Sequence, residues 1–294
     1  MPPTHLQQIR TLARNISIVE NEVEPSQEIL KNLSFKKKVP VIGITGPPGA
    51  GKSTLLNALL HQIDLTEKHI AIIAVDPTSP FNYGALLGDR IRLNAFYENP
   101  NVYIRSVASR GSLGGLSDKI IEIVDVVRAA HFDYIFLETV GVGQSEVEIA
   151  GLADTTVVVL VPEAGDEIQT MKAGLMEIAD IFVVNKADRA EADRFVHNLQ
   201  KLIHARPFSE WTTPILKTIA TQKEGLAELL KQINAHHQTQ HQSNKRPFLL
   251  TQKALKIIQK KRMVDLNQQA LFKEIQQKHL SPNFNLYQFV EKYF

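Results

Sequence analysis

A glycine-rich loop between an apolar run and a helical pattern constrains this chain of 294 residues more than any other feature. The run spans 39–45, the helical pattern starts at Thr54, and the loop between them reads G-x-x-x-x-G-K-S. Glycines let successive backbone N–H groups point at phosphate oxygens, and the N-terminus of the helix adds partial positive charge. Lys52 can then reach the β- and γ-phosphates, and the Ser53 hydroxyl can bind Mg²⁺. The strand–loop–helix context predicts a nucleoside triphosphate site rather than a plain glycine-rich turn. The residues expected to bind it are Gly46, Pro47, Pro48, Gly49, Ala50, Gly51, Lys52, Ser53 and Thr54.

Seven apolar segments alternate with helical patterns along the chain. They span 39–45, 69–76, 101–107, 133–139, 155–161, 181–185 and 214–219. Several are apolar throughout, as strands buried on both faces must be. Helical patterns such as 117–130 and 166–179 supply the crossovers, so we predict an α/β fold with a doubly wound, mostly parallel sheet. Ligands of such sheets bind at the carboxyl ends of the strands.

The segments on either side of this domain show helical spacing. We expect an N-terminal helical extension over 1–38, a nucleotide-binding domain over 39–235, and a linker with a C-terminal helical segment over 236–294. The polar stretch 236–244 reads as a linker or a frayed helix end; its His236, His237 and His241 are more typical of an exposed stretch than of a metal site. The apolar tail either covers the domain or pairs with a second copy, and we favour pairing.

Composition excludes several classes of function. Lys and Arg number 33 and Asp and Glu 31, so no polyelectrolyte partner such as nucleic acid is implied. The chain has no cysteine, which excludes disulfides and thiolate metal sites. The N-terminal residues lack a signal peptide pattern, and no apolar segment is long enough to span a bilayer. We therefore expect a cytoplasmic protein without a membrane partner.

The tetrapeptide Asn185-Lys186-Ala187-Asp188 follows a predicted strand and reads N-K-x-D. Guanine offers two donors, N1–H and the exocyclic amine, which one carboxylate accepts together, whereas adenine would place a lone pair against that carboxylate. Asp188 alone could be a helix N-cap. The order and distance from the phosphate loop are those of GTPases, so we predict guanine binding by Asn185, Lys186 and Asp188. A second base-contacting loop would fall at Ile219, Ala220 and Thr221.

Acidic residues lie at or near the same predicted sheet edge. Asp76 and Glu138 close strands and Asp89 lies in a later loop. Mg²⁺ prefers oxygen ligands, so we expect Ser53, Asp76, Asp89 and Glu138 to surround it, although each acid alone could be a cap or a surface residue. Gln144 lies in a glycine-rich loop and could orient water. The expected catalytic residues are Lys52, Glu138, Gln144 and Asp89. Four arginines are possible charge stabilisers, and nothing in the sequence selects among Arg90, Arg92, Arg105 and Arg110.

Six motifs in order give the chain a specific resemblance. They are the phosphate loop, A-V-D-P-T-S at 74–79, L-G-D at 87–89, E-T-V-G-V-G-Q-S-E at 138–146, G-D-E at 165–167, and N-K-A-D at 185–188. The chain resembles the methylmalonyl-CoA-mutase-associated GTPases, the MeaB/ArgK group. The resemblance implies a P-loop GTPase that gates adenosylcobalamin loading of an acyl-CoA mutase and protects or reactivates that mutase. It also implies homodimers formed through the C-terminal helices.

The same resemblance assigns roles to further residues. It makes Asp76, Asp89 and Glu138 the Mg²⁺-side acids. It also implies an additional switch loop over 163–174, with Asp166, Glu167, Gln169 and Lys172 as its active members. Two positions depart from the pattern, because Ala173 stands where a second lysine is common and Glu163 where a glycine is expected. Both departures fall in the loop that would signal to the partner.

The expected activity is GTP hydrolysis used as a timer. Lys52, Mg²⁺ and the loop amides would hold the charge that develops as water attacks the γ-phosphate. No arginine finger is evident, so we expect slow turnover alone and acceleration by the mutase. Two other functions share the pocket: a metallochaperone GTPase that delivers a metal ion to a client enzyme, and a transport-associated kinase. The lack of cysteine argues against the first, and no phosphoacceptor-docking feature supports the second.

Overall fold

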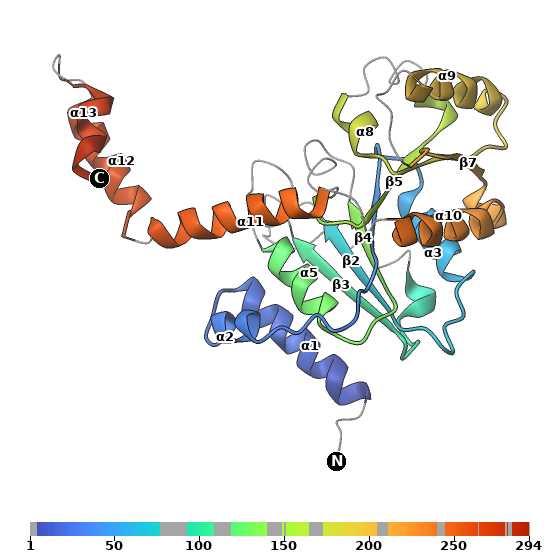
Figure 1. Cartoon of the computed structure of the whole chain (residues 1–294), viewed down its shortest axis with the longest axis horizontal. Coiled ribbons are helices and arrows are strands. Elements are labelled where there is room, and N and C mark those ends of the chain that lie inside the picture. The colour runs from blue at the N-terminus through green and yellow to red at the C-terminus, as the bar shows by residue number, and fades with distance from the viewer. Residues whose placement is uncertain are drawn as a thin grey trace. The chain divides into compact units, whose positions relative to one another are not determined.

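Seven parallel strands form one sheet in the computed structural model (Figure 1). Their order is β3-β2-β4-β1-β5-β6-β7, and every neighbouring pair is parallel. The strands are β1 (Val41–Thr45), β2 (Ile70–Asp76), β3 (Val102–Ala108), β4 (Tyr134–Thr139), β5 (Thr155–Leu160), β6 (Ile181–Asn185) and β7 (Ile215–Thr218). All seven predicted strands are present, so the α/β prediction with a mostly parallel sheet is confirmed.

The chain divides into two units, Met1–Ser243 and Asn244–Phe294, and each is described by itself. The structure describes residues 5–76, 93–108, 119–139, 149, 151–164, 173–204, 211–239, 245–263, 265–279, 281 and 284–293. None of the helices in these ranges combines the length and the hydropathy that crossing a membrane requires.

Helices cover both faces of the sheet because successive strand residues point to opposite sides. On one face, α3 (Lys52–Leu60) and α10 (Leu226–Thr239) pack through Leu55, Leu59 and Leu229 against the strands. The other face is covered by α1 (His5–Glu20) and α5 (Ile120–Arg128) over β2 and β4, and by α8 (Ala173–Ile178) and α9 (Ala192–His204) over β5 and β6. This two-sided arrangement is the predicted double winding (Figure 1).

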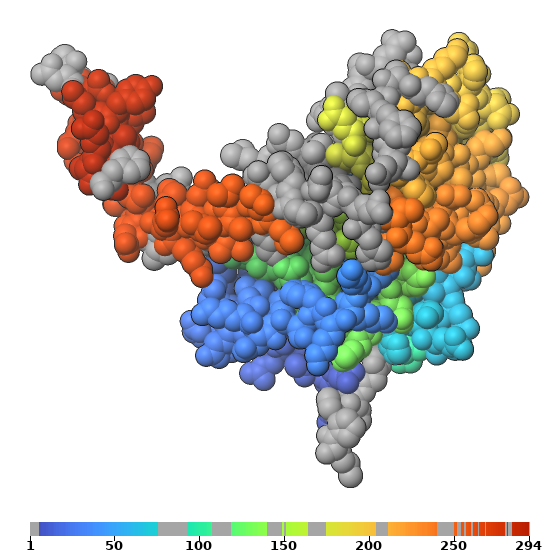
Figure 2. Space-filling view, viewed as in Figure 1, coloured from blue at the N-terminus to red at the C-terminus, as the bar shows by residue number. Residues whose placement is uncertain are grey.

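The N-terminal helices belong to the first unit. Leu12, Ile16 and Val19 of α1 are buried, and α1 packs beside α5 (Figure 1). A short helix, α2 (Ser26–Lys31), follows, and Figure 2 shows this blue segment on the surface of the first unit. Arg105 of β3 donates to Glu20 of α1 at 2.6 Å. Arg105 therefore anchors the helical extension, and the suggestion that it stabilises charge at the nucleotide is wrong.

The polar stretch that begins at His236 is not an exposed linker at its start. Helix α10 continues to Thr239, and only 5% of His236 is exposed. Its Nδ1 lies 2.8 Å from Thr155 Oγ1, and its ring centroid lies 4.8 Å from that of Trp211. His236 follows Ile233 by three positions, which places both on the buried face of the helix. His241 lies outside the described residues, which hold no group of three or more His, Cys, Asp or Glu suited to a metal.

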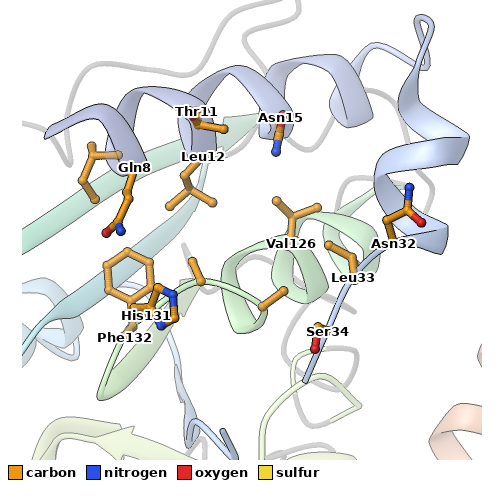
Figure 3. Close-up of a pocket in the computed structure, with 13 residues that line it drawn as sticks. Gln8, Thr11, Leu12, Asn15, Asn32, Leu33, Ser34, Val126, His131 and Phe132 are labelled. Carbon is orange, nitrogen blue, oxygen red and sulfur yellow. The ribbon is translucent and has the colours of Figure 1, made fainter. Parts of the chain in front are cut away.

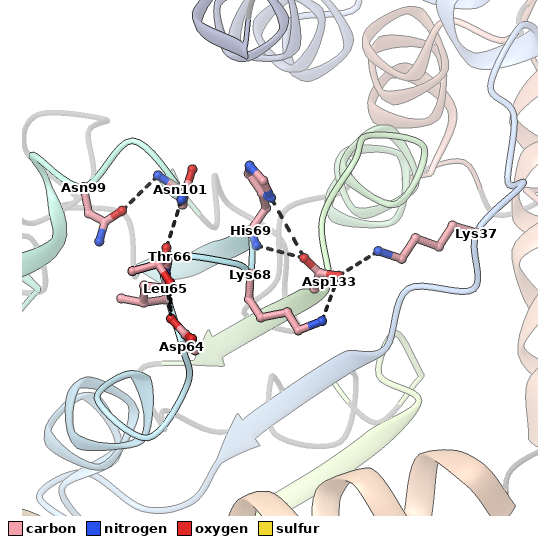
Figure 4. A network of polar contacts seen from close by, with 9 residues as sticks. All are labelled: Lys37, Asp64, Leu65, Thr66, Lys68, His69, Asn99, Asn101 and Asp133. Atoms are coloured by element: carbon pink, nitrogen blue, oxygen red, sulfur yellow. Dashed lines mark hydrogen bonds and ion pairs between the residues drawn. The ribbon is translucent and has the colours of Figure 1, made fainter.

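Asp133 joins segments at the amino ends of the strands through hydrogen bonds and ion pairs (Figure 4). Its carboxylate accepts from Lys37 Nζ at 2.8 Å and from the His69 backbone N–H at 2.9 Å, with Lys68 Nζ 3.9 Å away. Burial raises the pKa of Asp133, but these hydrogen bonds and lysine charges outweigh it and hold the pKa below its ordinary value. Asp133 thus links the connection into β1 to the start of β2.

The second unit contains α11 (Lys245–Arg262), α12 (Gln268–Lys278), α13 (Leu286–Val290) and a 3₁₀ turn η5 (Glu291–Tyr293). Asn267 and Asn285 cap α12 and α13 by accepting backbone N–H bonds. Large apolar side chains are exposed along this unit: Leu250, Leu255, Ile257, Ile258, Met263, Phe272, Leu286, Tyr287 and Tyr293. The predicted helical tail is therefore present, with an apolar surface.

Candidate nucleotide site

The two predicted nucleotide loops and the third candidate loop leave the same edge of the sheet. The phosphate loop follows Thr45 of β1, the N-K-x-D segment follows Asn185 of β6, and the 219–221 segment follows Thr218 of β7. Because all strands are parallel, their carboxyl ends meet at one edge, where ligands of this architecture bind.

The phosphate loop takes a backbone path that only glycine allows at two positions. Gly46 has a φ of 137°, and a Cβ there would lie 2.1 Å from the Val159 carbonyl oxygen. Gly51 has a φ of 86°, and a Cβ there would lie 2.5 Å from Asn185 Nδ2. The loop therefore runs close to β5 and against the N-K-x-D segment, and helix α3 begins directly after it at Lys52. This combination of curled backbone and helix N-terminus favours anions.

Lys52 holds its positive charge inside the curve of this loop. Its Nζ donates to the carbonyl oxygens of Gly46 at 2.8 Å and Pro47 at 2.9 Å, and the residue is buried. A buried ammonium group needs compensating partners, and the phosphate oxygens of a nucleotide are stronger ones than neutral carbonyls. Lys52 therefore lies within the phosphate loop, and its contact with phosphate oxygens stays a prediction.

Ser53 and Glu138 form a buried pair beside the loop. The Ser53 hydroxyl donates to Glu138 Oε1 at 2.5 Å, and each residue is 3% exposed. Glu138 lies in register with Ile44 on β1 and with Ala74 on β2, which brings the carboxylate to the start of the phosphate loop. A hydroxyl and a carboxylate are hard oxygen ligands, so this pair fits Mg²⁺.

The structure describes the other predicted metal and catalytic residues only in part or not at all. Asp76 is the last residue of β2, two positions past the residue in register with Glu138, and only its backbone is described. Asp89 and Gln144 lie outside the described residues. So do the arginines 90, 92 and 110, and the switch-loop residues Asp166, Glu167, Gln169 and Lys172.

Asn185 joins the three loops. Its Nδ2 donates to the Ala50 carbonyl at 3.0 Å, and its Oδ1 accepts from Thr218 Oγ1 at 3.1 Å and the Ala220 N–H at 3.2 Å. Asn185 therefore holds these loops together, and its part in guanine binding stays a prediction. The contact of Thr218 with Asn185 was not predicted. The sequence offers one clue to it, because Thr218 is a hydroxyl residue at the end of the strand that precedes the 219–221 segment.

In the N-K-x-D segment, Lys186 contacts the phosphate loop and Asp188 is exposed to solvent. Lys186 has a φ of 57°, and its Nζ donates to the Gly49 carbonyl at 3.0 Å. Asp188 is exposed, and its carboxylate makes no hydrogen bond or ion pair with another described residue. Its acceptor oxygens are thus available for a base. In the third loop, Ile219 is half-buried, Ala220 buried and Thr221 exposed.

Glu163, which departs from the family pattern, lies in the short 3₁₀ helix Pro162–Ala164, and only Ala164 separates it from the undescribed part of the predicted switch loop. It forms an ion pair with Arg189, the residue after Asp188. The carboxylate therefore lies next to the predicted base-binding segment. Ala173, the second departure, begins α8.

The parallel sheet, the curled loop with its buried lysine and the N-K-x-D segment joined to it define a nucleotide-binding protein of the P-loop GTPase class. Residues 12–278 match the family model described as methylmalonyl Co-A mutase-associated GTPase MeaB, and the chain belongs to this family. It is a GTP-hydrolysing enzyme.

Individual relatives agree with this assignment. The chain is 36% identical over 230 residues to GTPase ArgK of Escherichia coli (strain K12), covering 74% of this chain and 69% of that one. It is 36% identical over 231 residues to the fused isobutyryl-CoA mutase of Geobacillus kaustophilus (strain HTA426), covering 73% of this chain and 21% of that one. The crystal structure of a LAO/AO transport system kinase superposes with a TM-score of 0.69 at 27% identity, covering 99% of this chain and 98% of that one.

Proposed function

We propose that this protein is a chaperone for an adenosylcobalamin-dependent acyl-CoA mutase of the methylmalonyl-CoA mutase type. It hydrolyses GTP to gate adenosylcobalamin loading, and it protects or reactivates the mutase. The observation that carries the proposal is the match to a relative named as a fused isobutyryl-CoA mutase, in which a region similar to this chain is part of a mutase polypeptide. The family description names a mutase as well.

In the proposed mechanism the loop residues Gly46 to Thr54 hold the triphosphate. Lys52 exchanges its loop carbonyl partners for β- and γ-phosphate oxygens and stabilises charge that develops on them. Ser53, Glu138, Asp76 and Asp89 would hold Mg²⁺, and the bound ion would neutralise phosphate charge. Glu138, Asp89 and Gln144 position the attacking water.

Base selection rests on the loops that Asn185 joins. Asp188 accepts from the two donors on the guanine edge, while Asn185 and Lys186 hold its loop against the phosphate loop. Ile219, Ala220 and Thr221 border the base on the other side. An adenine base would leave the Asp188 carboxylate facing a lone pair, which is unfavourable.

Turnover in the isolated protein is slow in this proposal. Arg189, the residue after Asp188, is paired with Glu163. In this proposal the mutase supplies a charge-stabilising group when it binds. We further propose a cytoplasmic homodimer formed through the apolar C-terminal helices, without nucleic-acid or membrane partners.

The experiment measures GTP hydrolysis and cobalamin transfer together. Purified chain is incubated with GTP alone and with a methylmalonyl-CoA mutase, and adenosylcobalamin loading of apo-mutase is followed by its absorbance with GTP, GDP or a non-hydrolysable GTP analogue. The proposal requires faster hydrolysis with the mutase and loading that depends on the nucleotide. Lys52→Ala is the inactive control. Equal hydrolysis rates and equal loading in all nucleotide states would overturn the chaperone role.

A transport-associated kinase is the second candidate, favoured by the name of the similar crystal structure. Transfer of labelled γ-phosphate from GTP to a substrate-binding protein would support it, and release of inorganic phosphate alone would exclude it. A metallochaperone role has less support, because the chain has no cysteine and the described residues hold no metal cluster.

A further inference from the structure

A groove on the first unit and helix α11 of the second unit both lie outside the nucleotide loops. The groove lies between α1 and α5 and has a volume of about 380 Å³ (Figure 3). Gln8 and His131 on its rim are exposed, and no charged side chain lines it, so the groove selects no single class of occupant. Helix α11 differs, because its charge restricts what can bind to it.

The two units of the chain carry opposite excesses of charge. Residues 1–243 contain 23 Lys and Arg and 28 Asp and Glu, whereas residues 244–294 contain ten Lys and Arg and three Asp and Glu. Seven of those ten basic residues lie in α11, which has no acidic residue. Of the three acidic residues, Glu274 already accepts hydrogen bonds from Lys278 and Lys292, which lie outside α11. The second unit therefore has too few carboxylates of its own to neutralise α11.

Helical geometry gathers most of these cations on one face of α11. Successive residues are about 100° apart around a helix, so six positions of α11 fall within one arc of about 100°. Leu249 occupies one of them, and the other five are basic: Lys245, Arg246, Lys253, Lys256 and Lys260. We call these five residues the basic stripe. At 1.5 Å per residue, the stripe is about 22 Å long.

The basic stripe weakens the helix that carries it. Lys253, Lys256 and Lys260 are spaced three and four positions apart, where like charges on a helix surface repel one another. No acidic residue of α11 offsets this repulsion. A bound surface of opposite charge would remove it, so this face gains more from an anionic partner than a face of mixed charge would.

The position of the stripe disfavours a membrane as that partner. The exposed residues Leu250, Leu255 and Ile258 fall outside the arc, and Ile258 is almost opposite to its centre. A helix that lies in a bilayer buries its apolar face. This would turn the basic stripe toward water and away from the lipid headgroups. Pairing of two copies through the apolar face would likewise leave the stripe uncovered.

The charge of the first unit disfavours a long polyanion. Nucleic acid carries its phosphates far beyond the length of the stripe, so it would also meet the acidic excess of residues 1–243, which repels it. A patch of carboxylates on a folded protein can match the stripe and end where the stripe ends. Complementary patches of this kind provide specificity and fast association between proteins.

We propose that the basic stripe docks on an acidic surface of the client mutase, an assignment of the partner that rests on the proposed function. Lysines of the stripe pair with carboxylates of the mutase, while the nucleotide loops, which belong to the other unit, respond to hydrolysis. Because this contact is between exposed charges, it weakens as the salt concentration rises. The stripe sets the affinity and the association rate rather than the rate of the chemical step.

The test measures binding of a methylmalonyl-CoA mutase to three forms of the full chain by surface plasmon resonance at low and high salt. One form is the parent, and the second reverses the stripe with Lys253→Glu, Lys256→Glu and Lys260→Glu. The third is a control that changes the net charge equally at exposed positions of the first unit, with Arg194→Glu, Lys201→Glu and Lys231→Glu. We expect the stripe variant to bind about tenfold or more weakly at low salt, mainly through slower association, and the control to bind like the parent.

Both variants should keep the parent rate of GTP hydrolysis without the mutase. Equal binding of the parent and the stripe variant, or equal losses in both variants, would overturn the docking role and leave nucleotide-dependent loading of the mutase intact. Absence of mutase binding to the parent would overturn the docking role and the chaperone function together. Tight binding of the parent to a DNA duplex or to phosphatidylserine vesicles, lost in the stripe variant, would assign the stripe to those partners instead.

Discussion

Asn185 shows how a single side chain can set the geometry of a site that three loops share. Its amide contacts the phosphate loop through Ala50 and the third loop through Ala220. The residue is buried, so loss of the amide would leave a carbonyl and an N–H without these partners, each costing about 1–3 kcal/mol. The N-K-x-D motif indicated a base-binding role, and the structure adds a role in holding the loops together.

Replacement of Asp188 by Asn should change the base that the site accepts. The amide keeps one acceptor and introduces a donor, so guanine loses a hydrogen bond to a charged group while xanthine, with an oxygen at C2, gains a partner. We expect Asp188→Asn to weaken GDP binding by about 10- to 100-fold, from roughly 1.5–3 kcal/mol for such a bond, and to strengthen binding of xanthosine diphosphate. Calorimetry with both nucleotides checks this.

Asp188 is exposed, so the variant should retain the parent melting temperature. Unchanged affinity for GDP would contradict the assignment of Asp188 to the base, and tighter binding of ADP than GDP by the parent chain would contradict guanine selection altogether.

Two glycines of the phosphate loop should respond differently to the same substitution. Gly46→Ala places a methyl group 2.1 Å from the Val159 carbonyl, which forces the loop away from β5. At Gly49 no atom lies within 4 Å of the added Cβ, and only the positive φ of 77° is unfavourable, at about 1–2 kcal/mol. We expect Gly46→Ala to abolish detectable GTP binding and Gly49→Ala to weaken it modestly, as measured by fluorescence titration. Equal effects would contradict the close approach to β5.

At the scale of elements, the sequence predicted the sheet well because its strands are continuous apolar runs. In runs such as 155–161 and 181–185 the apolar residues are consecutive rather than alternating, as in strands buried on both faces. All seven predicted segments contain strands in the structure. The motifs also placed the phosphate loop and the N-K-x-D segment at the correct strand ends. These signals are local, so one chain sufficed to find them.

Contacts between distant segments escaped prediction for the opposite reason. His236 looked exposed because its neighbours in sequence are polar, yet it lies against Thr155 and Trp211. Arg105 pairs with Glu20, 85 positions away, and no local pattern marks either residue. Burial of one histidine or arginine depends on tertiary packing, which periodicity in a short window does not report.

The contact between α12 and the residues after α13 should depend on pH. Lys292 and Lys278 donate to the Glu274 carboxylate, and these hydrogen bonds lower its pKa from 4.5 to about 2. The carboxylate in turn raises the pKa of Lys292. Because the folded pKa of Glu274 is depressed, the stabilisation is present above about pH 4.5 and is lost as the pH falls toward 2. Because the pKa of Lys292 is raised, the stabilisation from its charge is lost only at strongly alkaline pH.

An NMR titration of the Glu274 side-chain carboxyl resonance checks this expectation. The midpoint should lie near pH 2, and Lys292→Met should move it upward because the strongest hydrogen bond is removed. A Glu274 midpoint near its ordinary pKa of 4.5 would contradict the contact.

At the scale of the whole molecule, the second unit leaves many of its large apolar side chains exposed to solvent. Phe272 of α12 is 64% exposed and Tyr287 of α13 is 81% exposed, and further aliphatic residues are exposed along α11. Exposed apolar surface of this kind marks an interface, and a second copy of the chain is the occupant that we propose. Symmetric pairing would cover the same residues on both copies.

We expect the parent chain to sediment at twice its 33.0 kDa mass at micromolar concentration. The double variant Leu255→Asp, Phe272→Asp should sediment at 33.0 kDa, because two carboxylates per chain would lose water at the interface without gaining a partner. Tyr97→Asp alters an exposed aromatic residue of the first unit and should remain a dimer. GTP binding should be unchanged in the double variant, since the nucleotide loops belong to the other unit. A monomeric parent chain, or a double variant that still pairs, would show that these apolar helices serve another contact.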